Sequence, residues 1–304
     1  MIYDIVIIGG GPAGLSAALY ASRAGRKTLV IEKAWTGGQI FQTHRIENYP
    51  GLTSISGPDL SQQLEEQARS FGAELKLASV TSIDLVPSLK RIALDDDTQF
   101  EARAVILAMG CQPRLLGIPG EHEFTGRGVS YCATCDGRFF QGKRIAVIGG
   151  GDTALEEALF LTRYASEVIL IHRRDKLRGT KVLQERLMAE PKVTILWNSQ
   201  PMEIQGDQKV TGLSIKNTLT GVIESLDIDG VFIYVGFKPN SELVSGQVEL
   251  DHDGFVHTDS ETLLTNCPYV YAIGDLRVKT LRQVVTAVAD GAIAAVLADR
   301  HLNN

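Results

Sequence analysis

Short apolar runs alternate with longer stretches of helical character along much of the 304-residue chain. Four of these runs are rich in β-branched residues: 5–8, 28–31, 145–148 and 168–171. Continuous apolar runs of this kind are typical of strands buried on both faces of a parallel sheet, whereas a half-exposed strand would alternate apolar with polar residues. Three further strands and an alanine-rich helix are predicted at 104–108, 230–235, 269–273 and 281–297. The pattern predicts an α/β fold built on parallel sheets.

The chain contains an internal repeat. Residues 4–32 align with residues 144–172 without a gap, at an offset of 140, and ten of the 29 positions are identical. Each copy runs from a strand through a glycine turn and a helix to a second strand. A βαβ unit used twice indicates two Rossmann-like, three-layer domains that bind mononucleotide units.

Two turn-rich stretches, 112–120 and 236–240, flank the second copy and are interpreted as crossovers between the domains. We therefore expect the second domain to be inserted into the first. The expected boundaries are 1–112 with 243–304 for the first domain and 113–242 for the second. The alternative, two domains in simple tandem, leaves about 60 C-terminal residues without a domain of their own.

The first copy carries a G-x-G-x-x-G loop between its strand and its helix. Its residues are Gly9, Gly10, Gly11, Pro12, Ala13 and Gly14. Gly9 permits the tight turn, Gly11 lets the backbone approach a pyrophosphate, and Gly14 lets the helix pack closely on the strand. Glu32 ends the second strand, where a carboxylate can bind ribose hydroxyls. This context favours a site for a dinucleotide with a free 2′-hydroxyl over a purely structural turn.

The second copy has the related G-x-G-x-x-A loop. Its residues are Gly149, Gly150, Gly151, Asp152, Thr153 and Ala154. The position equivalent to Glu32 is His172, which is followed by Arg173, Arg174 and Arg178. A carboxylate there would repel a 2′-phosphate, whereas guanidinium groups bind one. The second copy is therefore predicted to bind a 2′-phosphorylated dinucleotide, the alternative being a solvated basic helix start.

The chain has only four cysteines, which excludes a disulfide scaffold and favours a reducing compartment. Cys132 and Cys135 form a C-x-x-C pair, a spacing that allows a small-ring disulfide and lets one thiol lower the pKa of the other. The adjacent Asp136 is a candidate to manage protons for the pair. Zinc binding and a structural disulfide are the alternatives, but there is no second C-x-x-C and the histidines show no metal spacing. We expect a redox pair and no metal site, with Cys111 and Cys267 buried.

The net charge and the lengths of the apolar runs exclude two classes of binding partner. The net charge is −6, whereas a chain that binds mainly nucleic acid or an anionic membrane is usually basic. No run reaches the ~18–20 apolar residues of a membrane span. The N-terminal apolar run contains Asp4 and no basic segment precedes it, so it predicts a first buried strand and not a signal peptide. We expect a cytoplasmic protein whose partner is neither nucleic acid nor a membrane.

The chain combines a C-x-x-C with two predicted dinucleotide sites, one for a free 2′-hydroxyl and one for a 2′-phosphate. This combination suggests that electrons pass from one dinucleotide to the other and on to the cysteine pair. Over essentially its whole length the sequence resembles the low-molecular-weight thioredoxin reductases, which are class II pyridine nucleotide-disulfide oxidoreductases. The C-A-x-C-D motif just before the second glycine loop is the most specific feature. Besides the loops and the cysteines, the resemblance rests on residues 37–39, 46–51, 235–240, 274–275 and 282–284. The larger glutathione reductase type is less similar, because its cysteine pair lies near the N-terminus.

The resemblance implies a homodimeric flavoprotein in which a hydride passes from NADPH to FAD, then to the Cys132–Cys135 disulfide, and finally to a thioredoxin. It implies that Cys135 faces the flavin, that Cys132 attacks the protein substrate, and that Asp136 is the acid/base. FAD would occupy the first domain, and NADPH the second through its glycine loop, His172 and the three arginines. The further FAD-binding residues that it implies are Gly38, Gln39, Asn48, Gly274, Asp275, Arg282, Gln283 and Val284. Arg282 and Gln283 are expected to start a helix whose positive end faces the flavin.

Other functions stay open at this point. A related flavin disulfide reductase could serve another acceptor, such as a glutaredoxin-like or peroxide-reducing partner, and a ferredoxin-linked enzyme of related fold would lack the cysteine pair. A FAD-binding redox sensor without turnover would not need a 2′-phosphate site. Since the disulfide and the nicotinamide belong to one domain and must both meet one flavin, we also expect that domain to rotate, with hinges near Gly117 and Gly236.

Overall fold

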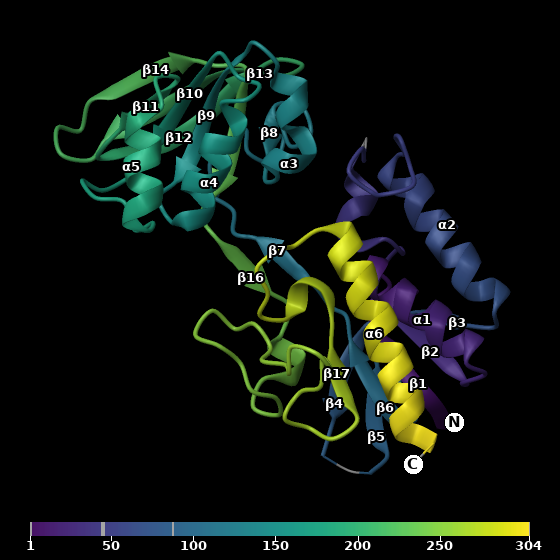
Figure 1. Cartoon of the computed structure of the whole chain (residues 1–304). Coiled ribbons are helices and arrows are strands. Elements are labelled where there is room, and N and C mark those ends of the chain that lie inside the picture. Colours follow the sequence, from purple (N-terminus) through teal and green to yellow (C-terminus); the bar gives the residue numbers. More distant parts are fainter. Residues whose placement is uncertain (1, 44–45, 87, 304) are drawn as a thin grey trace. The chain divides into compact units, whose positions relative to one another are not determined.

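The computed structural model describes residues 2–43, 46–86 and 88–303. The chain divides into two compact units, each with its own sheet (Figure 1). Unit 1 comprises residues 1–112 and 238–304, and unit 2 comprises residues 113–237. In the described part of the chain, no helix combines the length and the apolar character that crossing a membrane requires.

Unit 1 is built on a seven-stranded sheet in the order β3-β2-β1-β6-β5-β4, with β17 also paired to β6. The strands are β1 (Ile2–Ile8), β2 (Thr28–Glu32), β3 (Glu74–Leu77), β4 (Val80–Asp84), β5 (Lys90–Leu94), β6 (Gln99–Leu107) and β17 (Val270–Ala272). The β1, β2, β3, β6 and β17 pairings are parallel, and β4 and β5 add an antiparallel extension. The main helices are α1 (Pro12–Arg23), α2 (Gly57–Ser70) and α6 (Val284–Asn303).

Helices α1 and α6 lie side by side against the sheet of unit 1 (Figure 1). Six fully buried alanines belong to this part of the core: Ala17, Ala18, Ala21, Ala294, Ala295 and Ala298. At Gly291 of α6, a Cβ would lie 2.3 Å from the carbonyl oxygen of Ala13. Small residues therefore let the C-terminal helix approach the start of the helix that follows the first glycine loop.

Unit 2 is built on a parallel sheet in the order β11-β10-β9-β15-β8. Its strands are β8 (Val129–Ser130), β9 (Arg144–Gly149), β10 (Glu167–Ile171), β11 (Val193–Leu196) and β15 (Gly230–Tyr234). Its helices are α3 (Ala133–Asp136), α4 (Asp152–Leu161) and α5 (Lys181–Ala189). A separate antiparallel sheet consists of β12 (Ser199–Gly206), β13 (Val210–Asn217) and β14 (Ile223–Asp227). The predicted α/β class with parallel sheets is confirmed.

The internal repeat recurs in the strand register. In unit 1, Ile5 of β1 pairs with Thr28 of β2, and in unit 2, Ile145 of β9 pairs with Val168 of β10. The separation is 23 residues in both pairs, so each glycine loop leaves its sheet beside the carboxyl end of the neighbouring strand. In open α/β sheets this edge is where ligands bind.

Two short strands, β7 (Cys111–Pro113) and β16 (Phe237–Pro239), pair with each other where the chain passes between the units. The second passage lies between residues 237 and 238, five residues before the boundary at 243 that the sequence analysis used. Gly117 and Gly236 both fall inside unit 2. The Gly117 N–H donates to the carboxylate of buried Glu121 (2.7 Å), and the Gly236 carbonyl accepts from the Arg114 N–H (2.9 Å).

Candidate active site

The first glycine loop joins β1 to α1. Some of its glycines are required by close packing within the protein, whereas Gly11 borders open space. A Cβ on Gly9 would lie 2.4 Å from the Ala108 carbonyl oxygen, and one on Gly14 would lie 1.9 Å from the Gly9 carbonyl oxygen. Packing within the protein therefore demands both. Gly11 has an ordinary φ of −74°, and a Cβ there would meet nothing within 4 Å. Open space at a helix N-terminus is what the close approach of a diphosphate needs, so this loop fits a dinucleotide.

Glu32 lies at the carboxyl end of β2, next to this loop. Its Oε2 accepts a hydrogen bond from the Gly10 N–H at 2.7 Å, and its Oε1 accepts one from the Ala34 N–H at 3.2 Å. These bonds orient the carboxylate at the edge of the sheet. Because each carboxylate oxygen has two lone pairs, the group can still accept hydrogen bonds from ribose hydroxyls.

Asp275 lies in the short 3-10 helix η4 (Gly274–Leu276) and is largely buried. Its Oδ1 is buried, and no hydrogen-bond donor reaches it among the described residues. Burial raises the pKa of Asp275, an effect that the nearby cations Lys279 and Arg282 oppose. A buried acceptor without a donor is costly, and the hydroxyl-rich ribitol of FAD would supply one. This orphaned oxygen is a second feature of unit 1 that fits FAD.

Asp290 of α6 orders the turn that carries Asp275, although the sequence analysis did not single it out. Its Oδ2 accepts from the Gly274 N–H (3.0 Å), the Arg277 guanidinium (2.9 Å) and the Lys279 ammonium (2.9 Å). The Asp290 side chain is 7% exposed. Burial alone would raise the pKa of Asp290, but the hydrogen bonds from the two cations outweigh it and hold the pKa below its usual value.

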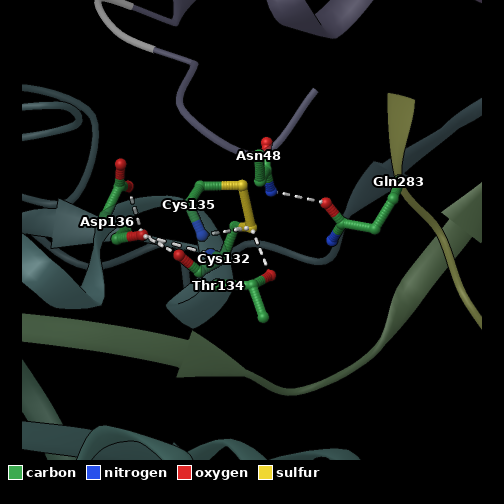
Figure 2. The surroundings of a disulfide bond; sticks show 7 residues. Asn48, Cys132, Thr134, Cys135, Asp136 and Gln283 are labelled. Carbon is green, nitrogen blue, oxygen red and sulfur yellow. Dashed lines mark hydrogen bonds between the residues drawn. A yellow bond between two sulfur atoms is a disulfide. The ribbon is translucent and has the colours of Figure 1, made fainter. Parts of the chain in front are cut away.

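Two amide side chains expected at the flavin are held by unit 1 itself. Gln39 follows Gly38 at the start of the 3-10 helix η1 (Gly38–Gln42), and its Nε2 donates to the Cys111 carbonyl. Asn48 Nδ2 donates to Gln283 Oε1 at 3.0 Å (Figure 2). These contacts bring together segments that are 72 and 235 residues apart in the chain.

The last helix begins later than predicted, at Val284 and not at 281, and it extends to Asn303. Arg282 therefore precedes the helix, as does Gln283, in contrast to the expectation that these two residues start it. The Arg282 guanidinium stacks over the Phe255 ring at 4.2 Å and donates to the Lys279 carbonyl at 3.3 Å. These contacts hold the segment in a loop that the helical pattern of the sequence does not reveal.

The second glycine loop joins β9 to α4. As in the first loop, one glycine is required by close packing and another borders open space. A Cβ on Gly149 would lie 2.6 Å from the Tyr234 carbonyl oxygen, whereas one on Gly151 would meet nothing within 4 Å. Asp152 Oδ1 accepts from the Thr180 N–H at 2.6 Å, which ties the helix start to the following loop. A pocket of about 180 Å³ opens here, lined by Gly151, Thr153, Ala154, Arg178 and residues 234–237. The loop and the pocket fit a pyridine nucleotide.

His172 directly follows β10, at the end of the second strand as predicted. The residue is only 6% exposed, and its Nδ1 and Nε2 lie 2.8 Å from the Gly149 carbonyl and 2.9 Å from the Lys176 carbonyl. A Cβ on Gly150 would lie 2.3 Å from the ring. Each ring nitrogen therefore faces a backbone carbonyl of the protein, and the nitrogen that carries the proton donates to it. His172 fixes the glycine loop to the next turn, and its effect on a nucleotide would be indirect.

Arg173 and Arg174 follow His172 directly and are exposed, as is Arg178. The Arg178 N–H donates to the Gly150 carbonyl at 2.7 Å, which places this residue beside the glycine loop. Three exposed arginines thus follow β10 within seven residues of its end. They supply the positive charge that a 2′-phosphate requires.

Cys132 and Cys135 are joined in a disulfide at the start of α3 (Figure 2). Cys132 is the N-cap of this helix, and its Sγ accepts a hydrogen bond from the Cys135 N–H at 3.2 Å. After reduction, the same N–H would stabilise a thiolate on Cys132, which is the form that attacks a disulfide. Asp136 follows in the helix, and its Oδ2 accepts from the Ser130 hydroxyl at 2.6 Å. Cys111 and Cys267 are buried free thiols, as predicted.

Two groups with raised pKa values lie near α3, and sequence reasoning missed the first of them, Glu157. Burial raises the pKa of Glu157, on α4, to about 7, and the charge of Glu156 adds to the effect. Burial also raises the pKa of the Tyr234 hydroxyl well above its usual value, with contributions from Glu157 and Asp136. Glu157 could have been found from the repeat, because its equivalent at the offset of 140 is Ala17, which is fully buried. The repeat shows that this helix face is apolar in the first copy, so a carboxylate at the same position in the second copy indicates a special role.

Comparisons with known proteins agree with this geometry. Residues 3–291 match the family model of the pyridine nucleotide-disulphide oxidoreductases, and the chain belongs to this family. Within it, the chain is 49% identical to a thioredoxin reductase of Mycolicibacterium smegmatis over 302 residues, covering 99% of this chain and 97% of that one. It is 46% identical to a thioredoxin reductase of Listeria monocytogenes, with coverage of 99% and 94%. The structure of thioredoxin reductase from Streptococcus pyogenes matches with a TM-score of 0.93 at 44% identity, covering 99% of this chain and 98% of that one.

The predicted resemblance to the thioredoxin reductases is therefore confirmed. The family consists of oxidoreductases that use FAD and NADPH, in agreement with the cofactors expected from the two glycine loops. Among the described residues, no group of histidine, cysteine and carboxylate side chains is arranged to hold a metal ion.

Proposed function

We propose that this chain reduces thioredoxin with electrons from NADPH, through FAD bound to unit 1 and the Cys132–Cys135 disulfide of unit 2. The observation that carries the proposal is the disulfide at the N-terminus of α3, in the same unit as the second glycine loop. Bound FAD supplies a two-electron carrier between the nicotinamide and the disulfide. The orphaned Asp275 oxygen and the open space at Gly11 support its placement in unit 1.

The cysteines carry the exchange step. After reduction, the Cys132 thiolate attacks one sulfur of the thioredoxin disulfide, and the other thioredoxin sulfur leaves as a thiolate. Cys135, once deprotonated, then attacks Cys132 in the mixed disulfide, which re-forms the bond in this chain and releases the second thioredoxin thiolate. Asp136 exchanges protons with the cysteine pair. The hydrogen bond from the Cys135 N–H to Cys132 Sγ supports Cys132 as the attacking residue.

NADPH would bind in unit 2, with its diphosphate at Gly149 and Gly151 and its 2′-phosphate at Arg173 and Arg174. The open space at Gly151 and the exposed guanidinium groups support this assignment. Arg178, which lines the pocket, would add a third charge.

The proposed setting is a homodimer in the cytoplasm. Three partly exposed apolar side chains on α6, Val285, Ile293 and Val296, offer a surface for a second copy of this chain. The two buried free thiols and the need for NADPH favour the cytoplasm.

The test replaces each active cysteine by serine. In Cys132→Ser and Cys135→Ser, NADPH should still bleach the flavin absorbance, whereas reduction of oxidised thioredoxin should fall to background. Cys267→Ser is the matched control, because a serine hydroxyl can keep the bond that Cys267 Sγ donates to the Gln247 carbonyl. Thioredoxin reduction by either active-site variant would contradict the proposal. A higher kcat/KM for a glutaredoxin-like protein would show that another acceptor is preferred.

A further inference from the structure

Ser130 lies at the end of β8, two residues before Cys132, and is 4% exposed. Phe232 of β15 is its partner in the parallel sheet, so the backbone position of Ser130 is set by a buried strand. The hydroxyl group has three neighbours at hydrogen-bonding distance. It lies 2.6 Å from Asp136 Oδ2, 3.1 Å from the Cys132 nitrogen and 3.3 Å from the Cys132 carbonyl oxygen.

A hydroxyl has one proton to donate and two lone pairs that accept. The Cys132 N–H uses one lone pair. When Asp136 is ionised, the proton goes to Asp136 Oδ2, which is the nearer acceptor at 2.6 Å and carries the charge, in preference to the Cys132 carbonyl. When Asp136 is protonated, the direction can reverse. The carboxyl proton is then donated to Ser130 Oγ, which accepts it on the second lone pair, and the hydroxyl proton turns to the Cys132 carbonyl.

We propose that Ser130 is a positioning residue that holds Asp136 in both of its protonation states and keeps it aligned with the backbone of Cys132. In the step that it serves, the carboxyl O–H of protonated Asp136 turns from Ser130 Oγ to a thiolate of the cysteine pair and transfers its proton, giving a carboxylate and a thiol. The Ser130 hydroxyl then turns from the Cys132 carbonyl to the new carboxylate. Only the two O–H groups turn in this change, and the heavy atoms of the carboxyl group keep their place. This inference rests on the role of Asp136 in the proposed function.

The test measures two steps separately across a pH range in the flavin-loaded enzyme. Ser130→Ala should leave the rate of flavin bleaching by NADPH within about twofold of the unmodified enzyme. It should lower kcat for thioredoxin reduction about 10–100-fold, a fraction of what general acid–base catalysis contributes, with little change in KM. The limb of the pH profile that depends on Asp136 should move to higher pH, because the carboxylate loses a hydrogen-bond donor. Tyr234, whose hydroxyl also interacts with the charge of Asp136, is unchanged in this variant. Ser130→Thr, which keeps the hydroxyl, should retain kcat within about threefold and the original pH profile.

Ser199→Ala is the matched control, because Ser199 is also buried in unit 2 (5% exposed) and donates one hydrogen bond, to the Trp197 carbonyl. It should change neither kcat nor the pH profile. An unshifted pH profile in Ser130→Ala would overturn the inference, as would a shifted one in a folded Ser130→Thr. In the Asp136→Asn background, Ser130→Ala should have no further effect on kcat, whereas a purely structural role would add to the loss. If Asp136→Asn alone leaves thioredoxin reduction intact, the role of Asp136 in the proposed function is what fails.

Discussion

Glu157 makes the stability of unit 2 depend on pH in a direction that can be calculated. Its Oε2 is buried and has no hydrogen-bond partner in the described part of the chain, and its pKa is raised from 4.5 to about 7, first by burial and then by the charge of Glu156. Between these two pH values, the folded protein holds a proton at Glu157 that the unfolded chain has released. Folding stability therefore falls as the pH rises from 4.5 to about 7 and is then constant in this respect.

The size of the effect follows from the two pKa values. Each unit of difference between the two pKa values corresponds to about 1.4 kcal/mol. The free energy of unfolding therefore falls by at most about 3 kcal/mol across this pH interval. Solvent reaches part of the side chain and screens it, so about 1–2 kcal/mol is the realistic range. Glu157→Gln cannot ionise and should be more stable than the unmodified protein by this amount at pH 8.5, and by little at pH 5.

Thermal unfolding at the two pH values measures this difference. With about 2–4 °C per kcal/mol for a domain of this size class, Tm of Glu157→Gln should exceed that of the unmodified protein by about 3–6 °C at pH 8.5. Glu224→Gln removes an exposed carboxylate from β14 and is the control, with no pH-dependent gain. Equal Tm differences at both pH values, or a loss at pH 8.5, would refute the reasoning.

Three further predictions address the cofactor sites. Gly14→Ala places a methyl group 1.9 Å from the Gly9 carbonyl oxygen, so the purified protein should contain less than half the normal flavin per chain, and an absorbance spectrum with full flavin content would contradict this. Replacing both Arg173 and Arg174 by alanine should lower kcat/KM for NADPH by about 100-fold or more, since each charged hydrogen bond is worth about 1.5–3 kcal/mol. The value for NADH should change little, and an equal loss with both nucleotides would argue against a 2′-phosphate site. Asp290→Asn leaves two cations without their buried, charged partner, so the free energy of unfolding should fall by about 3 kcal/mol or more and flavin retention should weaken. An unchanged Tm would show that the cluster does not order the turn.

Much of the fold could be predicted from sequence because its signals are local or repeated. The continuous apolar runs are strands buried on both faces, and the two copies of the βαβ unit pair with the same 23-residue separation. The antiparallel sheet β12–β14 was not predicted, since half of β12 and most of β14 are exposed and neither strand forms the continuous apolar run that marks the parallel strands. Its strands pair only with one another. The start of α6 was predicted three residues too early, because the stacking of Arg282 on Phe255 depends on residues far apart in the chain.

The candidate site divides in the same way. The glycine loops and the C-x-x-C were found because their chemistry depends on neighbours in sequence. Ser130, Glu157 and Asp290 were missed because their roles depend on contacts made by the folded chain: a hydroxyl between Asp136 and the Cys132 backbone, a carboxyl in an apolar setting, and a carboxylate between two cations. Serine, glutamate and aspartate are common on protein surfaces, so none of the three residues carries a signal of burial by itself.

The end of the second strand shows how one fold came to hold two cofactors. Glu32 in the first copy and His172 in the second occupy equivalent positions, and each bonds to the glycine loop of its own copy, Glu32 to the Gly10 N–H and His172 to the Gly149 carbonyl. Glu32 accepts a hydrogen bond and His172 donates one, but both residues orient the glycine loop from the end of the neighbouring strand. The shared task of this position is therefore structural. In the first copy the carboxylate has lone pairs left for a ribose, whereas in the second both ring nitrogens face carbonyl groups of the protein. We therefore expect the residues that follow, Arg173 and Arg174, to select a 2′-phosphate. An exchange of His172 for glutamate should then disturb the loop without transferring the cofactor preference of the first copy.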